Sequence, residues 1–361
     1  MKNSKKTIFL ILSDAFGGYG GIAEYNRNLL KALSESNKYD IYVFVRKGNA
    51  KVYNIGENFI QYKPIYNKYL FSIFVILKAI ILRPEIIFNG HIYTLSLSNL
   101  ILKITKSKGV TQFHGTEIWD RVLSRKKKNK LEKFKCLSVS NYTKNNLKLI
   151  NNINSKVLPN TYNPQFEILE NRDELRKRFE ISNDDCVIIS VGRLDSRKNG
   201  YKGQEDVIDF IRKQKEISNF NYKYFIVGKG ELKEHLENKI KRLDLQNDVF
   251  LLGYVNDNDL IEYYNCSDIF VLLSSGEGFG IVYLEAMACG LPAIGLDVGG
   301  VPDVLKYPFT KKILNYSMLD SAINDLFKNN RFSKTDISNS INHDFGFFVF
   351  SNRVNNFFNN I

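Results

Sequence analysis

The sequence predicts an α/β protein of two domains, each built on a doubly wound parallel sheet. A chain of 361 residues is long enough for two domains with their own cores. Short apolar runs alternate with segments of helical periodicity along most of the chain, which is typical of a parallel sheet covered by helices on both faces. In addition, a strand, a glycine-rich loop and a helix start follow one another twice, over residues 7–33 and 269–288.

Bulk composition indicates a globular chain kept in a reducing compartment. The sequence is 44% hydrophobic and 25% charged. Its longest apolar stretch, 69–82, is interrupted by Lys78 and is shorter than the roughly 18 residues that a spanning helix needs. The apolar run 8–12 behind Lys5 and Lys6 is too brief for a signal peptide, so we expect a first buried strand there. The four cysteines have no metal or redox spacing, and this predicts buried, reduced thiols in a cytoplasmic protein.

Charge is distributed unevenly along the chain. Residues 1–160 contain 27 Lys and Arg against 9 Asp and Glu, a net +18. Residues 161–361 contain 24 against 29, a net −5, which brings the whole chain to +13. This asymmetry indicates that the N-terminal half meets an anionic partner. A membrane surface, a lipid-linked phosphate and nucleic acid are the candidates, and a general bias toward Lys and Asn is the alternative.

The first glycine loop follows the strand at 7–12. Its glycines are Gly17, Gly18, Gly20 and Gly21, and apolar residues recur at helical spacing from Ile22 onward. This arrangement predicts a phosphate or ligand site at a helix start. The spacing is not G-x-G-x-x-G, which argues against a nicotinamide-dependent dehydrogenase.

Further strands and helices follow in alternation through the first half. Strands are expected at 41–45, 85–88 and 110–113, and helices at 69–82 and 95–104. His91 and His114 come directly after two of these strands, where ligands of parallel sheets bind. His91 is interpreted as structural or peripheral. We expect the basic run 121–135 to be an exposed helix. The more specific, functional interpretation is that it docks on an anionic membrane. No nucleic-acid motif accompanies it.

The second half begins with a strand at 187–191 that leads to Gly192 and Arg193. Strands at 224–227 and 249–252 lead to Gly228 and to the segment 253–255. The D-x-D at 257–259 precedes a helical pattern, so we interpret it as a helix cap and predict no required metal.

The second glycine loop, 274–280, follows the apolar strand at 269–273. A helix is expected from Ile281, with Gly290 and Pro292 ending it. Its start offers free N–H groups to a phosphate. Glu277 and Glu285 bracket the loop, and because a carboxylate repels phosphate, sugar hydroxyls are their expected partners. Phosphate and hydroxyls together indicate a sugar nucleotide.

The stretch 274–293 resembles the EGFG-x3-E, or E-x7-E, signature of retaining nucleotide-sugar glycosyltransferases of family 4, and 298–303 resembles its continuation. The resemblance implies the GT-B fold, in which two Rossmann-like domains face a cleft and a C-terminal helix crosses back to the N-terminal domain. Residues 157–161 resemble the family's LPNG segment, with Thr161 in place of glycine. The implied domains are 1–160 on the acceptor side, 161–340 for the nucleotide sugar, and 341–361 for the returning helix. After Asp303 the chain departs from the family's glycine-rich turn.

The resemblance also implies the site. Arg193 and a lysine before the next helix would hold the diphosphate; Lys198 and Lys202 are both candidates, and Lys202 is favoured because it starts a KGH-like segment. Glu277 would bind the sugar, Glu285 the ribose, and His114 the donor sugar. The residues implied as catalytic are Glu277, His114, Arg193 and Lys202. Those implied to bind the donor are Gly17, Gly18, Gly21, Arg193, Lys198, Lys202, Gly228, Val255, Glu277, Gly278, Phe279, Gly280, Ile281, Val282 and Glu285.

The implied function is a retaining transfer of a sugar from a UDP- or GDP-linked donor, with no cofactor and no metal. A chemistry in which Glu277 and Glu285 act as acid and nucleophile is disfavoured. The basic N-terminal half favours a lipid-linked or growing surface polysaccharide as acceptor, of the capsule, O-antigen or lipopolysaccharide type, at the cytoplasmic face of the inner membrane. No nucleic-acid partner is expected. A soluble small acceptor and a non-catalytic sugar-nucleotide-binding protein are the alternatives.

Overall fold

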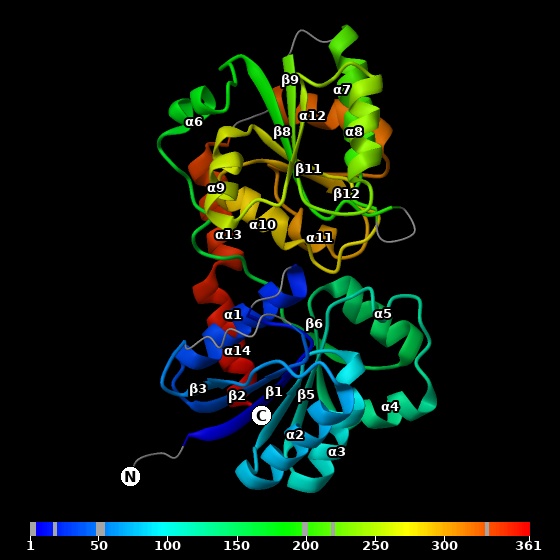
Figure 1. The fold of residues 1–361 in the computed structure, drawn as a ribbon, viewed down its shortest axis with the longest axis vertical. Coiled ribbons are helices and arrows are strands. Elements are labelled where there is room, and N and C mark those ends of the chain that lie inside the picture. The colour runs from blue at the N-terminus through cyan, green and yellow to red at the C-terminus, as the bar shows by residue number, and fades with distance from the viewer. Residues whose placement is uncertain (1–4, 17–19, 48–54, 197–200, 218–220, 329–331) are drawn as a thin grey trace. The chain divides into compact units, whose positions relative to one another are not determined.

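The computed structural model describes residues 5–16, 20–47, 55–196, 201–217, 221–328 and 332–361. The chain forms two compact units (Figure 1). Unit 1 comprises Met1–Thr161 and Phe347–Ile361, and unit 2 comprises Tyr162–Gly346. Within the described ranges, no helix is both long and apolar enough to cross a membrane.

Unit 1 is built on a seven-stranded sheet with every neighbouring pair parallel and the order β3-β2-β1-β4-β5-β6-β7. The chain enters at the middle, winds out to β3, returns to β4 and winds out to β7, which is the doubly wound order predicted. The strands are β1 (Lys6–Leu12), β2 (Tyr39–Val45), β3 (Phe59–Gln61), β4 (Ile86–Asn89), β5 (Lys108–Phe113), β6 (Phe134–Ser138) and β7 (Ser155–Val157).

Helices cover both faces of this sheet. One face carries α2 (Lys68–Leu82), α3 (Leu95–Thr105), α4 (Arg125–Leu131) and α5 (Asn141–Asn151), whose apolar side chains form one cluster with Ile87 of β4. Because side chains alternate along a strand, the next residue, Phe88, points to the other face, where its ring meets Phe358. That face carries α1 (Gly21–Glu35) and α14 (Phe347–Asn359). A short 3-10 helix, η1 (Ile92–Thr94), precedes α3.

The C-terminal helix α14 belongs to unit 1, as predicted, and packs on α1 (red beside blue in Figure 1). Phe350 is fully buried, and its ring meets that of Tyr25 edge-on at a centroid distance of 6.1 Å. The preceding helix, α13 (Lys334–Phe345), packs on α10 (Ile281–Ala288) in unit 2, and the chain passes from one unit to the other at Gly346.

The basic run 121–135 does not form one exposed helix. Only Arg125–Leu131 is helical, and β6 begins at Phe134. Phe134 and Cys136 point into the core, whereas Lys135 between them points outward. This alternation is that of a strand, so the end of the basic run forms part of the sheet and not an exposed helix.

Unit 2 repeats the plan with six parallel strands in the order β10-β9-β8-β11-β12-β13. The strands are β8 (Asp185–Val191), β9 (Asn221–Val227), β10 (Val249–Gly253), β11 (Ile269–Leu272), β12 (Ala293–Leu296) and β13 (Thr310–Ile313). The remaining helices are α6 (Arg172–Arg178), α7 (Gln204–Ile217), α8 (Lys233–Arg242), α9 (Asp257–Cys266), α10 (Ile281–Ala288), α11 (Val301–Val304), η3 (Tyr316–Met318) and α12 (Leu319–Lys328).

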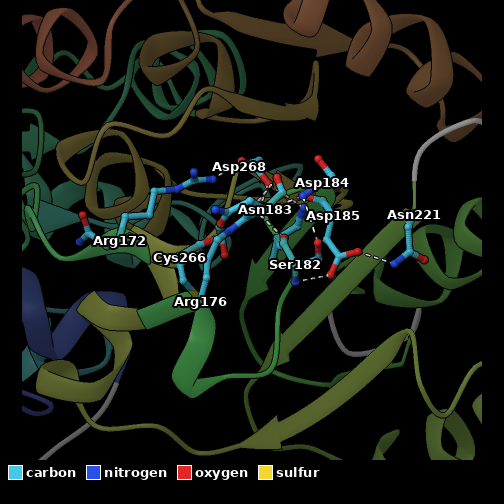
Figure 2. Close-up of polar contacts among 12 residues, drawn as sticks. Arg172, Arg176, Ser182, Asn183, Asp184, Asp185, Asn221, Cys266 and Asp268 are labelled. Carbon is cyan, nitrogen blue, oxygen red and sulfur yellow. Dashed lines mark hydrogen bonds and ion pairs between the residues drawn. The ribbon is translucent and has the colours of Figure 1, made fainter. Parts of the chain in front are cut away.

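A buried polar cluster anchors α6 at the amino ends of β8 and β11 (Figure 2). The Arg176 side chain is 1% exposed and pairs with Asp268 at 2.7 Å, while Arg172 pairs with the other oxygen of Asp268 at 2.5 Å. The Arg176 guanidinium also donates to four backbone carbonyls, those of Ser182, Asn183, Asp185 and Cys266. A buried arginine is tolerated because its donors are satisfied in this way. The cluster lies at the edge of the sheet opposite to the one described next.

Candidate functional site

The candidate site of unit 2 lies at the carboxyl ends of its two central strands. β8 and β11 are neighbours, and the strand order reverses between them. Ligands of doubly wound sheets bind at this switch point, because the loops that follow the two strands diverge there. The loop after β8 contains Arg193 and Lys202, and the loop after β11 contains Glu277.

Side-chain and backbone contacts join these two loops. The Lys202 ammonium lies 2.6 Å from Glu277 Oε1 and donates to Ser274 Oγ at 3.3 Å. Both charged side chains are largely buried, at 12% and 16% exposure. The Ser275 amide donates to the Tyr201 carbonyl at 2.9 Å. An ammonium has three donors, so the contacts with Glu277 and Ser274 leave Lys202 able to bind one more acceptor.

Gly203 explains how the first loop approaches so closely. Its φ is +78°, and a Cβ there would lie 2.4 Å from the Leu273 side chain and 2.5 Å from the Leu273 carbonyl. Only glycine fits both the conformation and the contact. Lys202 is thereby held against the second loop immediately before α7 begins at Gln204.

Arg193 presents its charge at the surface of the same loop. Its side chain is 71% exposed, with Nη1 2.9 Å from Asp195 Oδ2. The Arg193 carbonyl accepts a hydrogen bond from Gln204 Nε2 at 3.3 Å, which ties this residue to the start of α7. The guanidinium has five donors in a planar fork, a geometry suited to phosphate oxygens.

The second glycine loop ends in an uncapped helix start, as predicted. Gly280 has φ +93° as the N-cap of α10, and no side chain in the described residues caps this helix. The N–H groups of Ile281 and Val282, in the first turn, have no carbonyl within the helix to bind. Gly300 supports the loop from behind, because its amide donates to the Glu277 carbonyl at 2.7 Å. The N-terminal end of α10 can therefore receive an anion.

Not every predicted donor-binding side chain faces outward. The Phe279 side chain is buried, and its ring meets Phe345 of α13 at 5.8 Å between centroids. Ile281 is also buried. Only backbone groups of these two residues are therefore available to a ligand, whereas Gly278 and Val282 are half-buried.

Glu285 lies one turn into α10 and is half-buried. The Tyr264 hydroxyl, fully buried on α9, donates to Glu285 Oε2 at 3.3 Å. Burial, reinforced by the Glu285 charge, raises the pKa of Tyr264 well above its usual value, so its proton stays in this bond. The contact orients the carboxylate.

The ends of β9 and β10 carry Gly228 and Val255. Gly228 has φ +148°, and a Cβ there would lie 1.8 Å from the Gly192 carbonyl oxygen. Its amide donates to the Gly253 carbonyl at 2.7 Å. Gly228 therefore allows the backbone segments at the ends of β8, β9 and β10 to contact one another. Val255 is half-buried just beyond β10.

In unit 1, Gly17 and Gly18 lie outside the described residues. Gly20 is the N-cap of α1 with φ +95°, and Gly21 is the first residue of that helix. His114 follows β5 and its amide donates to Glu117 Oε1 at 2.6 Å. Its ring lies against Tyr25, with centroids 5.2 Å apart.

The His114 ring is buried and held by one backbone contact. Its Nε2 lies 3.0 Å from the Gly90 carbonyl oxygen. Because a carbonyl only accepts, Nε2 is protonated and Nδ1 carries the lone pair in the neutral ring. Burial lowers the pKa of His114 to about 4, against a smaller rise from the bond to Gly90. His91 caps η1, and burial lowers its pKa as well.

Lys198 also lies outside the described residues, so the geometry bears on Lys202 alone. Sequence reasoning missed several groups that hold the predicted ones in place: the Ser274 hydroxyl, the Tyr201 carbonyl, the Asp195 carboxylate and the Tyr264 hydroxyl. Ser274 adjoins the motif and could have been singled out. Asp195 lies two residues from Arg193, but a carboxylate at that spacing is no signal of a contact. The Tyr201 carbonyl and the Tyr264 hydroxyl act from distant segments, and no local pattern marks them.

Among the described residues, no group of three or more His, Cys, Asp or Glu is placed to hold a metal ion. The D-x-D segment begins α9, and the cap is Asn256, whose side chain accepts from the amides of Asn258 and Asp259. Asp257 and Asp259 lie in the first turn of the helix, where carboxylates stabilise its N-terminal end. All four cysteines are free and buried.

Comparison with protein families places most of unit 2 in a known group. A family model described as "Glycosyl transferases group 1" matches residues 171–342. N-acetyl-alpha-D-glucosaminyl L-malate synthase of Bacillus anthracis is 34% identical over 209 residues, which are 55% of this chain and 52% of that protein. The amylovoran biosynthesis glycosyltransferase AmsK of Erwinia amylovora is 28% identical over 235 residues, 60% of this chain and 54% of that protein. The chain spans about half the length of both relatives.

The fold has solved counterparts over its whole length. Anabaena Alr3699/HepE, in complex with UDP and glucose, matches 99% of this chain and 100% of its own with a TM-score of 0.77 and 18% identity. At that identity the similarity shows the fold alone. The GT-B fold predicted from the sequence is confirmed, and the family resemblance is confirmed for residues 171–342.

Proposed function

Because residues 171–342 form a domain of the Glycosyl transferases group 1 family, we propose that the chain is a retaining glycosyltransferase. It transfers a sugar from a UDP- or GDP-linked donor to an acceptor. The observation that carries this proposal is the joining of two loops at the switch point of unit 2, where Lys202, Glu277 and the open N-terminal end of α10 come together. HepE of Anabaena, which shares the fold, was solved with UDP and glucose.

The proposed roles follow from the chemistry of each group. The diphosphate would be held by Lys202, Arg193 and the amides of Ile281 and Val282. These groups would stabilise the negative charge that develops on it as the sugar departs. Electrostatic stabilisation of this kind is usually the largest contribution to catalysis. Glu277 would accept hydrogen bonds from sugar hydroxyls with the oxygen that Lys202 does not hold. Glu285 would bind the ribose.

The remaining donor contacts are assigned by the resemblance. Gly228, just after β9, would contact the donor, and Val255, just beyond β10, would contact the base through its backbone. The assignments of Gly21 and His114 in unit 1 to the donor stay predictions. No cofactor and no metal take part in the proposed reaction.

For the acceptor we propose a lipid-linked or growing surface polysaccharide at the cytoplasmic face of a membrane. The net +18 of residues 1–160 and the basic run 121–135 support it, as does the similarity to a glycosyltransferase of amylovoran biosynthesis. A small soluble acceptor is the second candidate, because another relative is named for a product with malate.

Donor turnover tests the proposal. The chain is incubated with UDP- and GDP-sugars and either lipid extract or small hydroxy acids, and mass spectrometry identifies released nucleotide and glycosylated product. We expect one donor to be consumed, and Arg193→Ala and Lys202→Ala each to lower kcat on the order of 10²–10³-fold, the usual loss when one electrostatic contact to the transition state is removed.

Matched controls separate these losses from general charge effects. Arg212→Ala on α7 and Lys233→Ala on α8 each remove an exposed helix pair of unit 2 and should leave turnover unchanged. If Lys202→Ala impairs folding because it leaves the Glu277 charge unpaired, the double variant Lys202→Met with Glu277→Gln, which removes both charges, takes its place in the turnover assay. Donor binding without any nucleotide release would favour a non-catalytic binding protein, and unchanged turnover in Arg193→Ala would refute the site.

A further inference from the structure

Helix α2 has two apolar faces. Phe71, Val75 and Ala79 are buried against the sheet of unit 1. On the opposite side of the helix, six large apolar side chains are each more than half exposed: Tyr69, Leu70, Ile73, Leu77, Ile80 and Ile81. Their spacing of three and four residues places them in one stripe along the helix.

A helix that covers a sheet in a water-exposed protein normally has a polar outer face. Between Lys68 and Lys78 the helix contains no charged residue, and the Lys68 ammonium lies 4.8 Å from the centroid of the Tyr69 ring. The ammonium of Lys78 turns toward the Tyr62 ring, 5.0 Å from its centroid. Helix α3 packs beside α2 and adds exposed Leu100 and Ile104. A gathering of exposed apolar side chains on two neighbouring helices marks an interaction site.

The charge beside this surface is of one sign. Helices α2, α3 and α4 together carry eight Lys and Arg residues and no Asp or Glu. Helix α4 packs on α3, where Lys130 Nζ donates to Ser96 Oγ at 2.7 Å. No ion pair found among the described residues neutralises any of the eight. The surface thus combines an aliphatic stripe with flanking cations.

The apolar stripe and the cations beside it together indicate what kind of partner binds this surface. A second copy of the chain would bring another positive face against this one, and like charges disfavour that contact. An anionic lipid surface matches both the apolar stripe and the flanking cations. The acyl chains contact the apolar side chains, and the negatively charged headgroups attract the lysines. The 15 residues of α2 extend about 22 Å, which is short of the roughly 30 Å hydrocarbon core of a bilayer, so the helix would lie in the interface.

We propose that the outward face of α2, extended by Leu100 and Ile104 of α3 and flanked by the lysines of α4, docks unit 1 on an anionic membrane. The inference rests on unit 1 alone and stands independently of the donor assignment. Because α2 follows β3, it begins at the carboxyl edge of the sheet, where His114 and the exposed Tyr93 also lie. The docked surface therefore starts at the edge where a ligand of unit 1 would bind.

Vesicle flotation with the full chain tests the proposal. Vesicles of phosphatidylcholine alone are compared with vesicles that also contain phosphatidylglycerol, at low and high salt. We expect binding to the anionic vesicles, weakened by salt. The triple variant Leu70→Ser, Ile73→Ser and Leu77→Ser should bind at least about tenfold less, because it removes the centre of the stripe that enters the acyl boundary.

Two controls in the same unit match these changes. Leu149→Ser, at an exposed position of α5, should bind as the parent does. Lys126→Gln with Lys127→Gln should weaken anionic binding more than Lys144→Gln with Lys148→Gln on α5, since both pairs remove two exposed charges. Fluorescence of the single tryptophan, Trp119, verifies that unit 1 stays folded.

Three outcomes would overturn the proposal. The first is parent protein that stays with the lipid-free fraction. The second is a folded triple variant that binds anionic vesicles as tightly as the parent. The third is a concentration-dependent dimer in sedimentation that the triple variant abolishes while vesicle binding is absent, because a second copy would then cover the stripe.

Discussion

His114 shows how burial decides the chemistry of a single side chain. In the sequence it is a histidine between a strand and a glycine, with an unperturbed pKa near 6.5. In the fold its ring is enclosed, and one nitrogen donates to the Gly90 carbonyl. The ring therefore stays neutral throughout the physiological range, as a fixed donor rather than a proton carrier.

Protein stability should fall on acidification because of His114. The unfolded chain takes up a proton near pH 6.5, whereas the folded ring resists until about pH 4. Its contribution is complete above pH 6.5 and is lost as the pH falls toward 4, by up to about 3 kcal/mol in the free energy of unfolding. Denaturant unfolding followed by Trp119 fluorescence at a series of pH values measures it.

The His114→Gln variant should show a shallower pH dependence between pH 6.5 and 4. Some dependence will remain, because burial also lowers the pKa of His91. His343→Gln, at an exposed position of α13 in unit 2, is the matched control and should stay close to the parent curve between pH 6.5 and 4, because the ring that pairs with Asp344 is largely in solvent. Equal slopes for His114→Gln and the parent would contradict the assignment.

Lys202 and Glu277 show a second effect at the residue scale. The sequence assigns one to the diphosphate and the other to the sugar, but the fold places them 2.6 Å apart in one ion pair. Each carboxylate and ammonium has more hydrogen-bonding capacity than the pair consumes. The pair orients both groups before any ligand arrives, and a largely buried charge would be costly without it.

At the scale of elements, the loops that follow the strands of unit 2 depend on backbone contacts that only glycine permits. Gly228 brings the β9 loop against the Gly192 carbonyl, and its amide bonds to Gly253. Both glycines have positive φ, but a Cβ at Gly253 would meet nothing within 4 Å. An alanine at Gly253 would therefore introduce backbone strain alone, whereas an alanine at Gly228 would introduce both backbone strain and a steric clash.

Gly228→Ala should therefore cost more than Gly253→Ala. We expect about 1–2 kcal/mol for Gly253→Ala, the usual penalty of a left-handed residue, and at least about 3 kcal/mol for Gly228→Ala, because overpacking adds to the strain. Thermal unfolding followed by circular dichroism measures both. Equal losses would mean that the β8 and β9 loops separate without penalty.

Helix α2 shows the limit of pattern analysis for an element. Its apolar periodicity predicts a helix at 69–82, and the helix spans Lys68–Leu82. An all-apolar helix is compatible with a buried position as well as with a surface that binds a partner. Only the packing of Phe71 and Val75 on the sheet shows which side is left outside.

At the scale of the whole molecule, the chain leaves unit 1 after Thr161 and returns to it at Phe347. The returning helix α14 closes one face of the unit 1 sheet through Phe350 and Phe358. The stability of unit 1 thus depends on the last fifteen residues of the chain, Phe347–Ile361.

Phe350→Ala should destabilise unit 1 by about 3–5 kcal/mol, because it leaves a cavity between α14 and α1. Phe348→Ala, two positions earlier on the same helix and 76% exposed, should change the free energy of unfolding by less than about 0.5 kcal/mol. Trp119 fluorescence during urea unfolding reports on unit 1 in both variants. Similar midpoints for the two would show that α14 does not contribute to the core of unit 1.

The sequence by itself determined the strand-and-helix alternation and the two glycine loops, and the family resemblance added the returning C-terminal helix. These features depend on local periodicity and on residues adjacent in the chain, such as Gly280 before Ile281. Only the tertiary structure decided that Lys202 meets Glu277, that Tyr264 orients Glu285, and that one apolar face of α2 stays in water. The first two contacts join segments that are far apart in the sequence. The exposure of α2 depends on which of its faces packs on the sheet. Both follow from how helices and strands pack around a parallel sheet, which no local pattern contains.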